Sequence, residues 1–310
     1  MSDRKKNFDL IRRGEKKPTL SGTLTFIGLR MADIPLQHAL LSHSHSSTAP
    51  ASSLGVRILS SLGLRTIFTH TSISLPSSLL LPIGTLTSPS ASPTPAWISL
   101  GWMTPLANLT PTSLLLLLMS AGSAAKQIYW HLALSQDSFP ASAAVAVSIY
   151  NTLVNSTNTL LFLALGTTSL LSRPLISFPS SSSSSPSCFS LPLSTVVGTL
   201  LYVVGMGIET VSERQRAQFK SRSENKGKVC KEGLWNWARH INYFGYALWR
   251  GGYCMVGCGW VGGILMGLWQ SWDLSHRAVA VQDEYCSARY GEQWVRFKQE
   301  VPCRIIPGIY

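Results

Sequence analysis

The chain has 310 residues and a net charge of +12, but only 13% of its residues are charged. A soluble domain carries about twice that charged fraction. Low charge combined with Leu-rich runs indicates a membrane protein whose positive residues lie in cytoplasmic loops. The basic residues cluster beside apolar runs and no nucleic-acid motif occurs, which argues against binding of DNA or RNA.

The N-terminal residues 1–19 are polar and basic, without the apolar core or the cleavage site of a secretory signal. We expect a cytosolic tail whose charge helps to orient the first membrane span. Residues 20–110 follow as a poorly defined membrane region with a Ser-rich loop, because their apolar runs are short and are broken by Pro, Gly and Ser. Two or three crossings are expected there.

From residue 111 onward the apolar segments reach the roughly 20 residues that a transmembrane helix needs. Predicted spans lie at 110–134, 142–166 and 191–209, and a fourth apolar segment at 243–272 follows a charged linker. The sequence therefore predicts an all-α, polytopic integral membrane helix bundle of about six to eight spans. Its reductase-like domain would cover residues 111–310.

The last apolar segment is expected to turn back within the membrane. The linker at 214–239 and the tail at 277–304 are both basic, and the positive-inside rule places both on the cytoplasmic side. An even number of crossings must then separate them, although about 30 residues are too few for two full spans. We predict a short broken hairpin that turns near the glycine cluster at 257–263. A single crossing with the tail outside is the alternative.

Polar side chains also fall inside the predicted spans. Ser148, Asn151, Asn155 and Asn158 share one helical face because they are spaced at i, i+3, i+7 and i+10. Amides facing lipid are costly, so this face is predicted to look toward other helices or a pocket. His131, on the preceding span, is either a packed histidine or a proton donor at bilayer depth.

No metal site is expected. The six cysteines are scattered and none forms a CxxC pair, so they are predicted to be small packing residues. His43 and His45 lie in a Ser/Ala/Pro loop that offers no rigid frame for a metal ion.

The charged linker combines carboxylates, cations and aromatic residues directly after a span. Such groups suit an anionic cofactor, because Arg and Lys bind phosphates while Asn, Tyr and carboxylates hydrogen-bond ribose and amide groups. An orientation signal, or attraction to anionic lipids, explains the same charge. No GxGxxG follows a strand and no Walker motif occurs, which excludes a Rossmann or P-loop site. The residues alone leave the choice open.

Two motifs in the last third of the chain carry a resemblance. The first is E-x3-E-x-Q-x3-F-K from Glu209 to Lys220, followed by GLW-x2-ARH-x-NYFG. The second is the ending DEYCSARYGEQWVRFKQEVPCRIIPGIY. In this order they resemble the C-terminal catalytic region of the steroid 5α-reductase-like superfamily, above all its uncharacterised DUF1295-type branch. The ending is similar to that of sterol C14- and C7-reductases. The resemblance covers residues 205–310.

This resemblance implies a multi-pass enzyme of the endoplasmic-reticulum membrane that uses NADPH to reduce a carbon–carbon double bond in a sterol, steroid or similar lipid. The cofactor region would face the cytosol, and a hydrophobic, sterol-like substrate would enter from the bilayer. The residues that match the family's cofactor-binding positions are Glu213, Lys220, Arg239, His240, Asn242, Tyr243, Arg277, Asp283, Glu284, Tyr290 and Arg304. Membrane lipids are the other expected partners, with no nucleic acid and no obligate protein partner.

Such a reduction needs a hydride from the cofactor and a proton from an acid of the protein. A neutral donor at membrane depth suits Tyr, His or a protonated Glu. The predicted catalytic residues are Tyr243, Tyr246, Glu209 and His131, with Tyr129 and Tyr202 as further candidates. The residues do not rank these donors.

Four positions depart from the family pattern. Ile241 replaces the proline of an RHPNY signature, and Tyr246 stands where the family has Glu or Asp. Val279 and Gln282 stand where sterol reductases have arginines. Tight NADPH binding and sterol specificity are the properties that these changes would affect.

Two other functions fit the same residues. A membrane S-adenosylmethionine-dependent methyltransferase of the isoprenylcysteine or phospholipid type also resembles this region, through an RHPxYxG signature and a basic tail. A sterol-binding membrane protein without catalysis would fit the departures at Tyr246 and Val279. The pair Asn242–Tyr243 and the RIIPGIY ending favour the reductase.

Overall fold

The structure is a computed structural model that describes residues 19–42, 44–46, 49–51, 53–66, 109–135, 137–164, 175–179 and 188–310. The predicted N-terminal tail and the apolar runs at 73–86 and 96–106 lie outside the described residues. The prediction of two or three crossings between residues 20 and 110 can therefore be compared with the structure only over residues 20–66, with short gaps, and 109–110.

Helices make up most of the described chain and strands very little of it, so the all-α prediction is confirmed. The α-helices are α1 (Leu20–Leu41), α2 (Leu54–Ser61), α3 (Pro111–Tyr129), α4 (Ala141–Leu163), α5 (Leu193–Ser221), α6 (Ile241–Asp273), α7 (Val279–Tyr290) and α8 (Glu292–Glu300). Shorter turns are the π-helices η4 (Trp130–Leu134) and η7 (Leu274–Ala278) and the 3₁₀ helices η5 (Ser223–Asn225) and η6 (Gly233–Asn236). Two small antiparallel hairpins pair β1 (Ser44–Ser46) with β2 (Ala49–Ala51), and β3 (Leu175–Pro179) with β4 (Cys188–Pro192).

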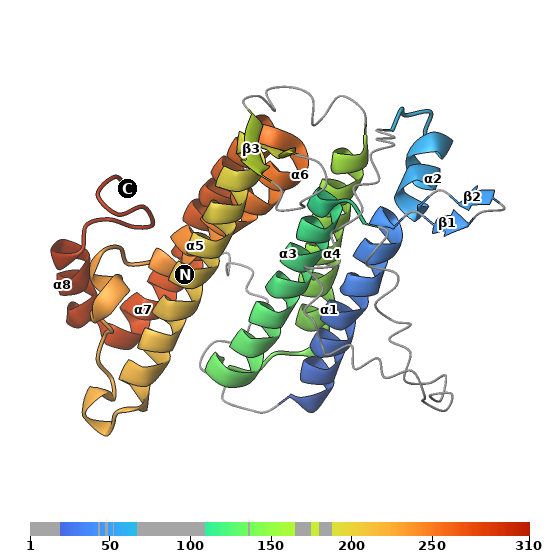
Figure 1. Ribbon diagram of the computed structural model, residues 1–310. Helices are drawn as coiled ribbons and strands as arrows, with labels where there is room; N and C mark the ends of the chain where they lie inside the picture. Colours follow the sequence, from blue (N-terminus) through green and yellow to red (C-terminus); the bar gives the residue numbers. More distant parts are fainter. Residues whose placement is uncertain are drawn as a thin grey trace, which may run out of the picture.

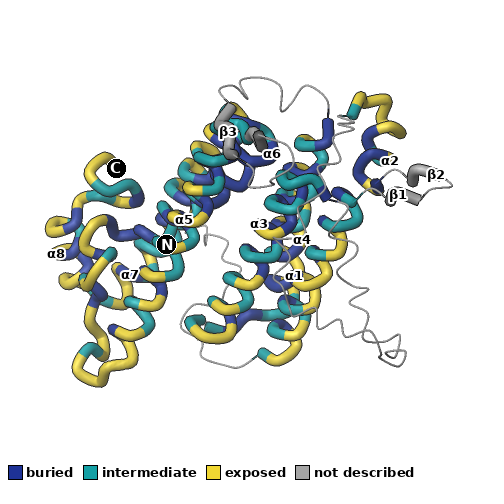
Figure 2. Tube along the Cα trace, in the orientation of Figure 1, coloured by how far each residue is buried: buried dark blue, intermediate teal, exposed yellow. Residues whose placement is uncertain are grey.

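The long helices form two groups (Figure 1). Helices α1, α3 and α4 pack together, and α5 packs along α6. Helices α7 and α8 and the C-terminus lie at one end of the α5–α6 pair (Figure 1). Buried residues run along the inner sides of the long helices, whereas α8 and the far end of α5 are largely exposed (Figure 2).

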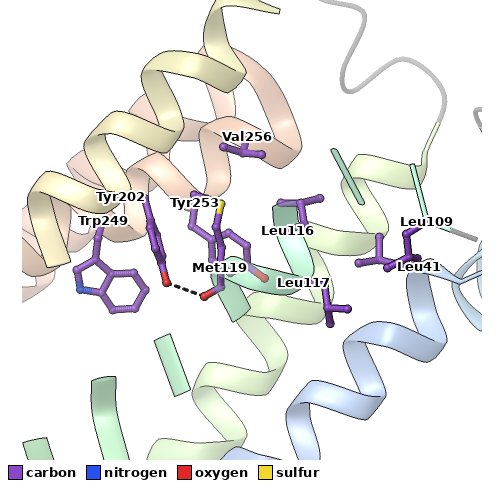
Figure 3. Packing of buried hydrophobic residues seen from close by; sticks show 9 residues of the cluster. All are labelled: Leu41, Leu109, Leu116, Leu117, Met119, Tyr202, Trp249, Tyr253 and Val256. Carbon is purple, nitrogen blue, oxygen red and sulfur yellow. Dashed lines mark hydrogen bonds between the residues drawn. The ribbon is translucent and has the colours of Figure 1, made fainter. Parts of the chain in front are cut away.

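One apolar cluster joins the two groups. It combines Leu116 and Met119 of α3 with Tyr202 of α5 and with Trp249 and Tyr253 of α6. The Tyr202 hydroxyl donates to the Met119 carbonyl at 2.7 Å (Figure 3). A buried tyrosine needs a partner for its hydroxyl, and here that bond ties α5 to α3.

Glycines bring α5 and α6 into close contact. A Cβ on Gly198 would lie 2.7 Å from the Gly252 carbonyl oxygen, and one on Gly205 would lie 2.6 Å from that of Gly245. Small residues at these crossings allow the backbones to approach, as is typical of helix pairs in membranes. The position of α6 along α5, and hence of the residues at its start, follows from these contacts.

The predicted hairpin is present and turns at Gly259. This glycine has φ 70°, a conformation that residues with a Cβ rarely adopt, and the helical path breaks there. The second arm runs back along the first, because a Cβ on Gly263 would lie 2.4 Å from Met255 Cβ. The first arm, residues 241–258, is about 27 Å long at 1.5 Å per residue, so it is longer than the half-span predicted.

The polar face of α4 looks inward, as predicted. Ser148, Asn151, Asn155 and Asn158 are all at most 2% exposed. Asn155 donates to Asp33 of α1 at 2.7 Å, and Asn158 donates to the Tyr253 carbonyl of α6 at 3.2 Å. The amides therefore join α4 to both neighbouring helices rather than facing lipid.

Two helical stretches of the described residues are long and apolar enough to cross a membrane: α5, and the run Ile241–Tyr290, which contains both arms of the α6 hairpin. Helices α1, α3 and α4 have 22, 19 and 23 residues but do not meet this criterion of composition. The number of six to eight spans stays a prediction.

Candidate functional site

A cleft lies where the end of α5, the linker, the start of α6 and helices α7 and α8 meet. We call it the linker–tail pocket. It is lined by Arg216, Lys220, Val229, Cys230, Trp235, Arg239, His240, Asn242, Tyr243, Gln282, Tyr285, Cys286, Tyr290, Trp294 and Phe297. Its cavity measures about 60 Å³, so it admits a few waters or a phosphate-sized group rather than a whole dinucleotide.

The linker is folded back onto α5 by two hydrogen bonds. The indole Nε1 of Trp235 donates to the Ser212 carbonyl at 2.7 Å, and the Leu234 N–H donates to Gln215 Oε1 at 3.0 Å. The turn begins at Gly233, whose φ of 60° favours glycine. These contacts bury Trp235 and place the following residues beside the pocket.

Arg239 and His240 hold the C-terminal tail against the linker. Their backbone N–H groups donate to the carbonyls of Cys303 and Arg304, at 3.0 and 2.8 Å. The Arg239 Nη1 also donates to the carbonyls of Val301 at 2.7 Å and Pro302 at 3.0 Å. Desolvation, with the nearby charge of Arg304, lowers the pKa of Arg239. The carbonyl dipoles offset this cost and fix the linker and the tail as one unit.

Aromatic rings form one wall of the pocket. The His240 and Tyr243 rings stack at 5.3 Å with an angle of 7° between their planes, and Trp294 lies edge-on to His240 at 6.4 Å. The Trp294 Nε1 donates to Asp283 Oδ1 at 2.6 Å. Asp283 therefore orients Trp294 from behind, because its carboxylate accepts the indole proton.

The charges around the pocket are unequal. Arg216 forms an ion pair with Glu213, and Glu213 Oε1 also accepts from Asn242 Nδ2 at 2.8 Å. Lys220 makes no ion pair within 4 Å among the described residues. The positive charges of Arg216 and Arg289 repel the Lys220 ammonium group, and the attraction of the Asp137 carboxylate is weaker. The pocket therefore presents more positive charge than its own carboxylates balance.

Parts of the chain are similar to known proteins. Residues 147–272 match the family described as "Protein of unknown function (DUF1295)". The chain is 34% identical to the 7-dehydrocholesterol reductase of Danio rerio over 91 residues. It is 32% identical to the Delta(14)-sterol reductase of Saccharomyces cerevisiae over 129 residues. The resemblance to the steroid 5α-reductase-like superfamily is confirmed.

The extent of these similarities differs between relatives. The matched parts cover 28% of this chain and 18% of the Danio rerio protein, and 37% of this chain and 28% of the yeast protein. The chain also matches "Probable O-methyltransferase ustE" of Ustilaginoidea virens, at 28% identity over 285 residues. That match covers 92% of this chain and 84% of the relative. The likeness to this superfamily's sterol reductases is therefore confined to part of their length.

The structure gathers a subset of the predicted cofactor residues in one place. Those that line the linker–tail pocket are Lys220, Arg239, His240, Asn242, Tyr243 and Tyr290. Glu213 lies directly behind Asn242, and Asp283 lies behind Trp294. These two carboxylates position residues that line the pocket.

The remaining predicted cofactor residues lie outside the pocket. Arg277 forms an exposed ion pair with Asp273 on the preceding turn. Arg304 is exposed and donates to the Tyr310 hydroxyl at 3.1 Å. Glu284 is exposed on α7. None of these three residues lines the linker–tail pocket.

The predicted catalytic residues fall at three different places. Tyr243 lines the pocket. Tyr246 and Glu209 lie deeper, where the Trp249 ring is 5.0 Å from that of Tyr246 and its Nε1 donates to Glu209 Oε2 at 2.7 Å. His131 is elsewhere, between the rings of Phe26 and Phe139, 5.5 and 5.0 Å away.

Several pocket residues were not predicted from the sequence. Arg216 lies three residues after Glu213 and four before Lys220, so helical spacing could have added it to the first motif. Trp294 and Cys286 carry no such signal. Cys230 packs in an apolar cluster with Phe219 and Trp235, and burial raises the pKa of its thiol.

Proposed function

We propose that the chain is a membrane-embedded, NADPH-dependent reductase of a carbon–carbon double bond in a sterol, steroid or related lipid. The observation that carries this proposal is the linker–tail pocket. Arg216, Lys220 and Arg239 line it, whereas none of its described lining residues is an Asp or a Glu. Guanidinium and ammonium groups bind phosphate oxygens strongly.

The residues fit the phosphate end of such a cofactor better than its whole length. Lys220 supplies a cation without an ion-pair partner among the described residues, and Tyr290 and Tyr243 supply rings and hydroxyls beside it. The cavity of about 60 Å³ has room for a phosphate-sized group only. The rest of the dinucleotide must lie along the open side or require the pocket to widen.

When bound, NADPH would supply the hydride. The protein must supply a proton, and Tyr246 is the best placed of the predicted donors. The Arg250 Nη2 donates to the Tyr246 hydroxyl oxygen at 3.3 Å. Because the hydroxyl oxygen accepts this bond, its own O–H is left to donate to a substrate. Glu209 is less suited, because its carboxylate is already engaged by Lys126 and by the Trp249 indole N–H.

A groove beside Glu209 offers a place for the lipid. It lies between α3 and α5, measures about 520 Å³, and has a nearly entirely apolar surface formed by Ala125, Lys126, Tyr129, Met206, Gly207, Thr210 and Val211. An apolar groove on the outer side of two long helices suits a ligand that arrives through the bilayer. Location in the endoplasmic-reticulum membrane, with the pocket facing the cytosol, is part of the same proposal.

An S-adenosylmethionine-dependent methyltransferase is the second candidate. It is favoured by the similarity to the Ustilaginoidea virens protein named as a probable O-methyltransferase, which extends over 92% of this chain. The charge of the pocket argues against it. A sulfonium is a cation, which the Arg and Lys side chains of the pocket repel, although the aromatic wall is of a kind that binds cations.

Titration of the purified full chain with NADPH, and separately with S-adenosylmethionine, tests the proposal. We expect NADPH to bind, and Lys220→Ala to weaken it about 10- to 100-fold, since a hydrogen bond to a charged group contributes about 1.5–3 kcal/mol. Lys228→Ala is the matched control, because Lys228 is an exposed cation of the same linker that does not line the pocket. The proposal is wrong if only S-adenosylmethionine binds, or if both variants weaken NADPH equally.

A further inference from the structure

A group of charged and polar residues lies deep between the two helix groups. It consists of Arg30 and Asp33 of α1, Asn155 of α4, and Arg250 and Tyr253 of α6, and we call it the inner cluster. All five residues are at most 2% exposed. Ionisable groups at such depth are costly and are typical of functional sites in membrane proteins.

Hydrogen bonds fix the position of the inner cluster. Asp33 forms an ion pair with Arg30 at 3.3 Å and accepts from Asn155 Nδ2 at 2.7 Å. The Arg250 Nη1 donates to Asn155 Oδ1 at 3.1 Å, and its Nη2 donates to Asn151 Oδ1. Arg250 also lies over the Trp249 ring, 4.4 Å from its centre. Side chains of three helices therefore meet around two guanidinium groups.

The charge of the inner cluster is not balanced. It has two guanidinium groups and one carboxylate, and Arg250 makes no ion pair within 4 Å among the described residues. The two cations are close enough to repel each other. One negative charge is missing, and a buried unpaired ion costs several kcal/mol.

Unused donors accompany the missing charge. Arg30 Nε, Arg30 Nη2, Arg250 Nε and the Tyr253 hydroxyl are buried and have no hydrogen-bond partner. The Tyr253 phenol lies within the electrostatic influence of Asp33 and Arg250. Buried polar groups normally have partners, so this set indicates a ligand with acceptor oxygens.

We propose that the inner cluster binds the carboxylate of a membrane-soluble amphiphile. A carboxylate supplies the missing negative charge, and its oxygens accept hydrogen bonds from the four donors. The ligand must come from the bilayer, because the cluster is sealed from water while the outer faces of the same helices expose Leu29 of α1, Leu153 of α4 and Leu265 of α6. The proposal does not depend on the reaction at the linker–tail pocket.

The inner cluster and the pocket are linked along α6. Tyr243, Tyr246, Arg250 and Tyr253 follow at i, i+3, i+7 and i+10, so they share one face of the first arm. Arg250 lies about 10 Å beyond Tyr243 along the helix axis. An amphiphile held by its carboxylate at Arg250 would therefore extend next to the residues proposed to act in catalysis.

Binding of palmitate and of methyl palmitate to the full chain in detergent tests this proposal. The two probes share the same chain, but only palmitate carries a negative charge. We expect palmitate to bind at least about tenfold more tightly, and Arg250→Gln to remove the difference between the probes. Equal affinity of the wild-type chain for both probes would refute the proposal.

Since Arg250→Gln also breaks bonds to Asn151 and Asn155, Tyr253→Phe is the decisive variant. It removes a hydroxyl without a partner, so the thermal stability should not fall, whereas palmitate affinity should fall about tenfold with methyl palmitate unchanged. Tyr202→Phe is the matched control, because its hydroxyl is bonded to Met119. It should lower stability and leave the preference for palmitate intact.

Chloride could supply the missing charge without any lipid. Its titration in place of palmitate separates the two sources. If chloride stabilises the protein and palmitate is bound no better than its ester, the inner cluster is an inorganic anion site and the proposal fails. Unchanged palmitate affinity in Tyr253→Phe would contradict the assignment equally.

Discussion

Tyr246 shows how a departure from a family pattern can be compensated by its surroundings. A tyrosine there lacks the carboxylate that the family pattern has, but it receives a hydrogen bond from Arg250. The Arg250 Cζ also lies 5.6 Å from the centre of the tyrosine ring. The guanidinium therefore fixes the position of the phenol, whose O–H remains available as a proton donor.

We therefore predict that Tyr246→Phe lowers turnover about 100-fold, while NADPH affinity stays within about twofold, because general acids contribute about 10²- to 10⁴-fold. His131→Gln should leave turnover nearly unchanged, since His131 lies between Phe26 and Phe139, away from the pocket. Single-turnover reduction with pre-bound NADPH separates the two steps. Loss of turnover in His131→Gln alone would move the proton donor to η4.

The motifs in the sequence predicted part of the pocket but not the way its members share their contacts. Lys220, His240, Asn242 and Tyr243 could be named because they belong to a recognisable pattern. The role of Arg239 in holding the tail could not, because its acceptors are backbone carbonyls about 60 residues further along the chain. Every residue has a backbone carbonyl, so the sequence does not indicate which of them accept these hydrogen bonds.

At the scale of the elements, the glycines of α5 set how closely α6 approaches. Gly205 and Gly207 are two residues apart on the same helix, but only Gly205 faces α6. A Cβ on Gly205 would lie 2.5 Å from the Trp249 backbone nitrogen, whereas a Cβ on Gly207 meets nothing within 4 Å. Substitutions at these two glycines therefore distinguish the effect of helix packing from that of helix propensity on stability.

Gly205→Ala should destabilise the protein by about 1–3 kcal/mol, because the helices must move apart. Gly207→Ala should stabilise it by about 0.5–1 kcal/mol, because alanine favours the helical backbone. Thermal unfolding of both variants in the same detergent measures the difference. Shifts of the same sign and size would mean that the close contact between α5 and α6 is not maintained in the detergent.

The elements differ in how far the sequence predicts them. Glycine clustering and charge balance predicted the α6 hairpin, because both depend on short-range rules. Helix α1 was harder, since Pro35 follows its apolar run and suggests a break there. The structure shows one helix of 22 residues, in which Asp33 pairs with Arg30 and accepts a hydrogen bond from Asn155 of α4. The sequence does not show these partners, because they depend on how the helices are arranged in space.

At the scale of the whole molecule, the hairpin returns the chain to the side where it entered. The linker and the tail then meet at one end of the α5–α6 pair, where α7 and α8 complete the pocket (Figure 1). Arg239 is the residue that connects them most directly. Its side chain is 8% exposed and its donors serve carbonyls at Val301 and Pro302.

Arg239→Ala should therefore release the tail and open the linker–tail pocket. Loss of these charge-assisted bonds costs about 2–3 kcal/mol, so we expect faster proteolytic cleavage between α8 and the C-terminus, together with loss of NADPH binding. Arg304→Ala is the control, because Arg304 is exposed and its described contacts are with Tyr310. If Arg239→Ala abolished NADPH binding while the tail stayed resistant to protease, the guanidinium would act on the cofactor directly. If the tail were released and NADPH still bound, α7 and α8 would not form part of the cofactor site.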